Sequence, residues 1–299
     1  MAGGIRNWQG QLRAAANLIP GLVEARIQSS ISDSAFPNYT RCQHTRTVST
    51  EEDSATSLLL GSFISFDIIY CASTRRPSFL DIDHLHVLKN LSIPMESLTG
   101  CRNSIMALVH EVSLLDRWKE DCQAAHRLSI IGLAERGRQI EERLRKELAS
   151  MGTKLSKGIR VCSHAGVPPA PSHPEVSKLF ALSALIYLHV VISGAHPELP
   201  EIAEAVSQAV SVFQGLHDRR LLKGILVWPF CVSGCLALQE QQSFFRDLFY
   251  STGATESSIG TCFEAFKIME ECWEARKTRS LSCDWVSIMN RRGYYVLLR

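Results

Sequence analysis

The segment 221–238, LLKGILVWPFCVSGCLAL, constrains the fold more than any other stretch of this chain. It is the most apolar long run in the sequence and has no broad polar face, so it predicts a helix that is buried on every side. Pro229 lies in its middle, lacks a backbone donor and crowds the preceding turn. We therefore expect a kinked central helix around which the other elements pack.

Helical periodicity extends through the rest of the chain. Apolar residues recur at three- and four-residue steps over long segments, and we find neither a strand-length alternating pattern nor a repeat of fixed period. Segments 54–73 and 175–193 are apolar around most of the helix and are expected inside the fold, whereas 99–120, 127–150 and 201–216 are amphipathic. The sequence thus predicts an all-α fold, a multi-helix array around a buried, Pro-kinked helix.

Two segments rich in loop-forming residues interrupt these patterns. Segment 29–54 is rich in Ser, Thr and Asp and predicts a flexible loop, and segment 151–174 contains Gly, Ser and several prolines and predicts a connection. The second could separate two lobes, but a surface connection within one helical array is favoured. We therefore predict a single domain over residues 1–299.

The charge balance of the chain is nearly even. Its 32 basic and 30 acidic residues give a formal charge of +2, which favours neither nucleic acid nor an acidic membrane as a partner. The most basic stretch, 136–160, contains the pairs Glu141/Arg145 and Glu142/Lys146 at the i,i+4 spacing of a solvated helix face. The longest apolar windows, broken by His189 and Pro229, are interpreted as too short to span a membrane.

The cysteine spacing and the missing cofactor motifs exclude several kinds of binding site. The 10 cysteines form no C-x-x-C pair and no zinc-site spacing, which favours a reducing cytoplasmic environment. We find no dinucleotide loop, phosphate loop, zincin motif or nucleophile elbow, so we expect no cofactor. Residues 81–86, Asp-Ile-Asp-His-Leu-His, form a metal-like cluster, but we interpret it as a solvated turn or helix end and expect no metal.

Asp67 is the most informative ionisable residue because it lies in a wholly apolar helical pattern. A buried carboxylate must find donors or become protonated. The favoured interpretation is a structural partnership with Arg75, Arg76 or backbone donors. The alternative is a catalytic acid in a closed apolar pocket with His189 as its counterpart, although a lone histidine there is more often a core residue. His110 is expected on the solvated side of its helix.

Several other side chains could line an apolar pocket between the central helices, although such residues belong to the core by default. The candidate ligand-binding residues are Phe63, Tyr70, Tyr187, Trp228 and Cys235.

The order of several short landmarks points to a family. They are Trp8-Gln-Gly-Gln-Leu12, Phe66-Asp67 with Arg76-Pro77, Leu98-Thr-Gly-Cys101, Leu185-Ile-Tyr187-Leu188, Trp228-Pro229, Gly234-Cys235 and Asp284-Trp285. Together they resemble the fungal-specific transcription factor domain, the helical regulatory region that follows a six-cysteine zinc cluster in many fungal regulators. The resemblance covers residues 8–299. That family reads DNA through the zinc cluster, whose spacing is missing here, so we expect no direct nucleic-acid binding unless the chain is a fragment.

The resemblance implies two function hypotheses. One is a regulatory or small-molecule-sensing domain, cytoplasmic or nuclear, that acts through a partner protein, an apolar effector or a homodimer. The other is a repurposed cofactor-independent enzyme of fungal secondary metabolism, a cyclase, isomerase, dehydratase or pericyclase acting on an apolar polyketide or terpenoid. A cavity of roughly several hundred cubic ångströms that contains Asp67 or His189 would favour the enzyme.

Overall fold

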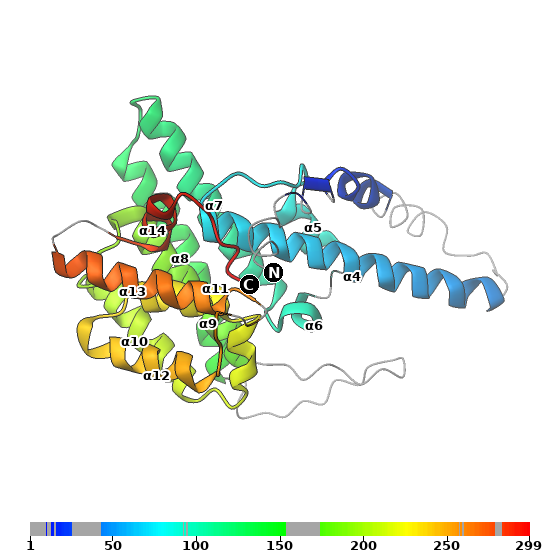
Figure 1. The fold of residues 1–299 in the computed structure, drawn as a ribbon. Coiled ribbons are helices and arrows are strands. Elements are labelled where there is room, and N and C mark those ends of the chain that lie inside the picture. Colours follow the sequence, from blue (N-terminus) through cyan, green and yellow to red (C-terminus); the bar gives the residue numbers. More distant parts are fainter. Residues whose placement is uncertain are drawn as a thin grey trace.

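The structure is a computed structural model that describes residues 10, 13–14, 16–25, 43–91, 93, 95–153, 174–256, 258, 260–278 and 283–299, with backbone alone for 43–54, 153 and 278. All regular secondary structure in these ranges is helical and none is strand (Figure 1). The predicted all-α class is confirmed.

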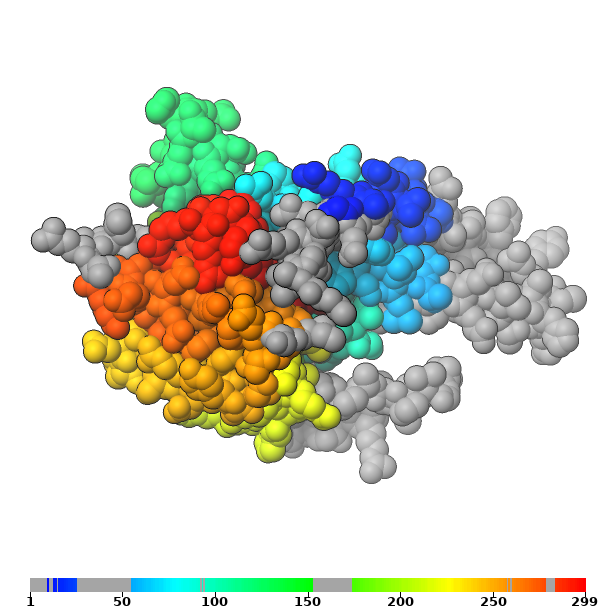
Figure 2. Space-filling view, in the orientation of Figure 1, coloured from blue at the N-terminus to red at the C-terminus, as the bar shows by residue number. Residues whose placement is uncertain are grey.

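The α-helices of the core turn apolar side chains inward. They are α4 (Gln43–Thr74), α5 (His84–Asn90), α6 (Met95–Thr99), α7 (Asn103–Ala124), α8 (Ile130–Thr153), α9 (Pro174–Ser193), α10 (Pro200–Gln214), α11 (Val227–Cys235), α12 (Gln242–Ser251), α13 (Cys262–Thr278) and α14 (Trp285–Arg292). Two 3-10 helices, η2 (Arg219–Lys223) and η3 (Gln239–Gln241), precede α11 and α12. The end of α7 and the start of α8, green in Figure 2, project from the body of the molecule.

Helix α9 lies at the centre of the helical array. It packs against α7, α8, α10 and α11, and its side chains from Val176 to Val191 are buried except for Lys178. A helix that is apolar around its whole circumference is stable in water only where other helices cover every side. The central position predicted for this segment is thus confirmed.

Residues 226–237 of the segment 221–238 are buried as predicted, but the segment is not one kinked helix. It consists of η2, a turn and the nine-residue helix α11, all of whose residues are buried. Pro229 is the third residue of α11. In the first turn of a helix the backbone donors have no intrahelical acceptor, so a proline there removes no hydrogen bond and needs no kink. The prediction of a Pro-kinked helix was wrong in this respect.

The close contact between α11 and α13 depends on Gly234. A Cβ atom at this position would lie 2.1 Å from Met269 Cε and 2.8 Å from its Sδ. The missing side chain lets the two helices approach, and the Trp273 indole N–H donates to the Gly234 carbonyl at 2.7 Å. The Gly234-Cys235 landmark of the sequence is therefore a packing feature of the core.

The predicted loop 29–54 was wrong in its second half. Helix α4 begins at Gln43, so residues 43–54 are helical, while 29–42 lie outside the described residues. Ser, Thr and Asp lower helix propensity by only a few tenths of a kcal/mol, and a buried helix that follows can extend through them. The predicted connection 151–174 is helical at 151–153 and at Pro174, and the remainder lies outside the described residues.

Segments far apart in the sequence meet at α4. The Leu298 amide donates to Ser73 Oγ at 3.4 Å, and the Arg299 guanidinium donates to Ser65 Oγ. Figure 1 shows the C-terminal residues beside α4. The assignment of residues 1–299 to a single domain stays a prediction.

Two helical segments, Ala55–Thr74 and Pro174–Ser193, are long and apolar enough to cross a membrane by length and composition. The expectation that every apolar window was too short was therefore wrong. In the fold, 61% of the first apolar window and 83% of the second are buried against other helices. Helices at the core of a protein show the same burial.

Candidate functional site

Asp67 lies at a buried junction of α4, the segment after it and α5. Its Oδ1 accepts the Phe79 amide at 2.9 Å, and its Oδ2 accepts from Ser78 Oγ and from His84 Nε2, the latter at 2.8 Å. Burial alone would raise the pKa of Asp67, but the hydrogen bonds from His84 and Ser78 and the charge of His84 together hold it below its ordinary value. The predicted backbone donor is present, whereas neither predicted arginine binds this carboxylate.

His84 connects Asp67 to a second buried histidine. Its Nδ1 lies 3.1 Å from the Ile82 carbonyl and its Nε2 faces the carboxylate, so both ring nitrogens have acceptor neighbours. The His110 ring stacks on His84 with 4.5 Å between centroids. His110 is only 5% exposed, so its predicted position on a solvated face was wrong, because α5 packs against α7 there.

The buried His110 predicts a specific pH dependence of stability. Burial first, and then the neighbouring His84 charge, lower the pKa of His110 to about 4, although the Asp67 and Asp83 carboxylates oppose this shift. Between an unfolded pKa of about 6.5 and the folded value, the unfolded chain binds more protons, so stability falls as the pH falls. At about pH 5 this amounts to roughly 2 kcal/mol relative to neutral pH. Urea unfolding of the wild type and His110→Phe at both pH values measures it.

The phenyl ring of His110→Phe retains the stack on His84 but cannot titrate. We therefore expect this variant to lose about 2 kcal/mol less than the wild type on acidification, whereas the exposed control His217→Phe behaves like the wild type. Equal losses in the wild type and His110→Phe would contradict the prediction.

His189, the predicted counterpart of Asp67, lies elsewhere. Its Nε2 is 3.8 Å from Glu141 of α8. Burial lowers the pKa of His189 below its ordinary value, and the charges of Glu141 and Glu201 oppose this. Among the described contacts, none joins His189 to Asp67.

A second buried polar centre surrounds Arg75. Its Nε lies 3.1 Å from Asp116 Oδ2 and its Nη2 lies 2.8 Å from Asp284 Oδ2, and its guanidinium lies over the rings of Tyr187 and Trp285. The Tyr187 hydroxyl also donates to Asp116 at 2.9 Å. Arg75 thus joins the end of α4 to α7, α9 and the start of α14.

The predicted ligand-binding residues are parts of the core rather than of one site. Tyr70 stacks on Phe79 and Trp228 on Phe180, and Tyr187 belongs to the Arg75 centre. Cys235 Sγ lies 4.0 Å from Cys231 Sγ, and Phe63 packs half-buried against the core. None of these five residues, nor Asp67 or His189, lines the concavities around Leu108, Val87 or Met106.

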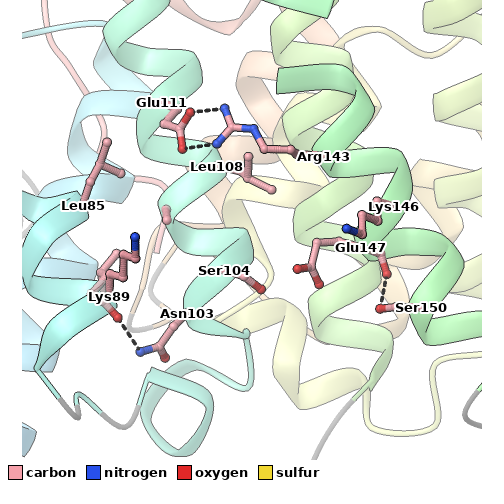
Figure 3. Close-up of a pocket in the computed structure, with 12 residues that line it drawn as sticks. Leu85, Lys89, Asn103, Ser104, Leu108, Glu111, Arg143, Lys146, Glu147 and Ser150 are labelled. Carbon is pink, nitrogen blue, oxygen red and sulfur yellow. Dashed lines mark hydrogen bonds and ion pairs between the residues drawn. The ribbon is translucent and has the colours of Figure 1, made fainter. Parts of the chain in front are cut away.

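An open cleft of about 680 Å³ lies between α5, α7 and α8 (Figure 3). We refer to it as the α5–α7–α8 cleft. Its surface is mainly apolar, with charged side chains around it. Its lining residues are Leu85, Leu88, Lys89, Asn103, Ser104, Ala107, Leu108, Glu111, Arg143, Lys146, Glu147 and Ser150.

The structure explains why sequence reasoning missed this cleft. Of the two predicted i,i+4 pairs on α8, Glu141/Arg145 is present at 2.8 Å, but Glu142 pairs with Arg138 instead of Lys146. Lys146 lines the cleft. The basic stretch 136–160 was the one sequence feature that pointed to a charged binding site here, and the same pattern is typical of a solvated helix face.

The family model for the fungal specific transcription factor domain matches residues 1–298. The chain belongs to this family. The resemblance predicted from the landmarks is thus confirmed, and the Arg75 and Asp67 centres are two of the buried polar contacts between the helices of this transcription factor domain.

Curated relatives of this domain are fungal gene-cluster regulators. The chain is 31% identical to the trichothecene biosynthesis transcription regulator of Trichoderma arundinaceum and 29% identical to the regulator of the same name from Fusarium sporotrichioides, covering 98% of this chain and 68% of each relative. It is 29% identical to the transcription factor ntnD of a Nectria species over 77% of this chain and 38% of that protein. No solved structure matches the chain.

Proposed function

We propose that this chain is the regulatory domain of a transcription regulator of a fungal secondary-metabolite cluster, and that it responds to a small molecule bound in the α5–α7–α8 cleft. The family and the names of the relatives support the regulatory part. The observation that carries the ligand-binding part is the cleft, because about 680 Å³ with a mainly apolar surface falls within the range of small-molecule sites. We place the protein in the nucleus, where a transcription regulator acts.

The position of the cleft suggests how an effector would act. Helix α5 is joined to α4 through His84 and Asp67, while α7 and α8 both pack against the central helix α9. A ligand that contacts α5 on one side and α8 on the other favours the arrangement in which both walls reach it. Its binding is therefore linked to the relative position of α4–α5 and the α7–α9 core, which a partner protein can recognise.

The alternative enzyme hypothesis has no comparable support. Its two candidate residues are not brought together, and the Asp67 carboxylate is already bound by a hydroxyl, an amide and an imidazole. The cleft contains neither residue. The regulator is the hypothesis that the geometry favours.

Transcript and metabolite profiles of the host fungus test this proposal. Deleting the gene should lower the transcripts of the whole metabolite cluster together. Ser104→Trp, which places a large ring in the cleft from an exposed position on α7, should leave the protein abundant but abolish the transcriptional response to added cluster metabolites. The matched control Ser211→Trp, on the exposed side of α10, should respond normally. Unchanged transcripts with accumulation of one precursor in the deletion strain would instead identify an enzyme.

A further inference from the structure

The charges around the α5–α7–α8 cleft are unevenly compensated. Both carboxylates have a guanidinium partner: Glu111 pairs with Arg143 at 2.8 Å, and Glu147 lies 3.6 Å from Arg102. No ion pair among the described residues includes Lys89 or Lys146. Two ammonium groups therefore remain uncompensated, on α5 and α8, and Figure 3 shows them on opposite sides of the cleft with Leu108 and Ser104 between them.

The remaining lining divides into an apolar surface and a few polar groups. Leu88 and Leu108 are buried in the cleft wall, and Leu85 and Ala107 are half-buried in the same lining. The Asn103 side chain already donates to the Ile93 carbonyl at 2.9 Å, so it belongs to the scaffold. A ligand that covers Leu85 and Ala107 removes apolar area from water, and the same ligand needs a negative charge to compensate the lysines.

We infer that the effector of this cleft is an amphiphilic organic anion, such as a hydrophobic carboxylic acid, whose charged group lies between Lys89 and Lys146 and whose apolar body covers Leu85 and Ala107. This inference rests on the proposed function, since it names the chemical class that the same cleft takes. The cleft volume, about 680 Å³, suits a small molecule better than a folded peptide segment.

A matched pair of fluorescent probes tests the inference on the purified chain. 1-Anilinonaphthalene-8-sulfonate and N-phenyl-1-naphthylamine have the same aromatic body, but only the first carries an anionic group. We expect the sulfonate to bind more tightly than the neutral probe, with an affinity that falls as salt is added. Lys89→Gln and Lys146→Gln should each weaken binding of the sulfonate by about three- to fivefold and leave the neutral probe unaffected.

Control variants separate the possible results. Lys277→Gln removes an exposed lysine of α13 outside the cleft and should change neither probe. Ser104→Trp should reduce binding of both probes, and Ala107→Met provides a smaller obstruction should the first variant fold poorly; circular dichroism checks the fold of each. In a contrary result, the two probes would bind equally well, with no change in the lysine variants but with loss of both probes in Ser104→Trp. That result would show that ligands bind in the cleft, and it would overturn the inference that they are anions. No effect of obstruction on either probe would overturn the proposed site itself.

Discussion

Replacing Arg75 with methionine is expected to lower the free energy of unfolding by about 3–5 kcal/mol, measured by urea or thermal unfolding at neutral pH. The guanidinium is the shared partner of Asp116 and Asp284, whose side chains are 7% and 5% exposed. Methionine retains apolar contact with the rings of Tyr187 and Trp285 but leaves two buried carboxylates without their cation. Loss of one partner from a buried ion pair is costly because the remaining charge has no water to replace it.

The neighbouring Arg76 provides the control for this experiment. It is exposed and lies over the ring of Tyr295, so Arg76→Met should change the free energy of unfolding by less than about 0.5 kcal/mol. If the two variants lost equal stability, the Arg75 centre would not be the junction between α4, α7 and α14 that its contacts indicate.

Asp67→Asn is expected to lower the free energy of unfolding by about 3 kcal/mol, because an amide cannot accept from every donor that the carboxylate binds and leaves the His84 imidazole without its counter-charge. The pKa of Asp67 is lower in the folded protein than in the unfolded chain. Its stabilisation is thus fully present above about pH 4 and is lost as the pH falls through the folded value. The difference in free energy of unfolding between the wild type and Asp67→Asn should therefore shrink as the pH falls below about 4.

An exposed aspartate close in sequence serves as the comparison. Asp81→Asn, three residues before His84, should be nearly neutral because Asp81 is solvent-exposed. A small effect of Asp67→Asn would indicate that the donors around Asp67 find other acceptors. In either outcome, retained transcriptional regulation in the Asp67 variant at low temperature would agree with a structural role for this carboxylate.

Local sequence patterns predicted much of the helical architecture. The apolar circumference of 175–193 indicated the central helix α9, and the amphipathic pattern of 99–120 corresponds to α7. The same reasoning failed for Pro229, because a proline within an apolar run fits both a kink and a first turn, and only the position of the helix start distinguishes them. Composition also failed at 43–54, where a loop-like sequence continues a buried helix.

The candidate site was the least predictable part. The sequence indicated that Asp67 needs a partner. His84 belongs to the metal-like cluster 81–86, but nothing in either segment showed that His84 and Asp67 are in contact. His110 was misplaced because a helical wheel gives the direction of a side chain relative to its own helix, not which other helix covers it. The α5–α7–α8 cleft was missed for the same reason.

The sequence by itself determined that this chain folds as helices, that α9 and α11 are buried, and that it belongs to the fungal specific transcription factor domain family. These properties depend on spacing along the chain and on the order of landmarks. Only the tertiary structure decided that Asp67 binds His84, that Arg75 joins three distant segments, and that Lys89 and Lys146 line one cleft from different helices. Such contacts join residues from different helices, and their partners are fixed by how whole helices pack rather than by any local pattern.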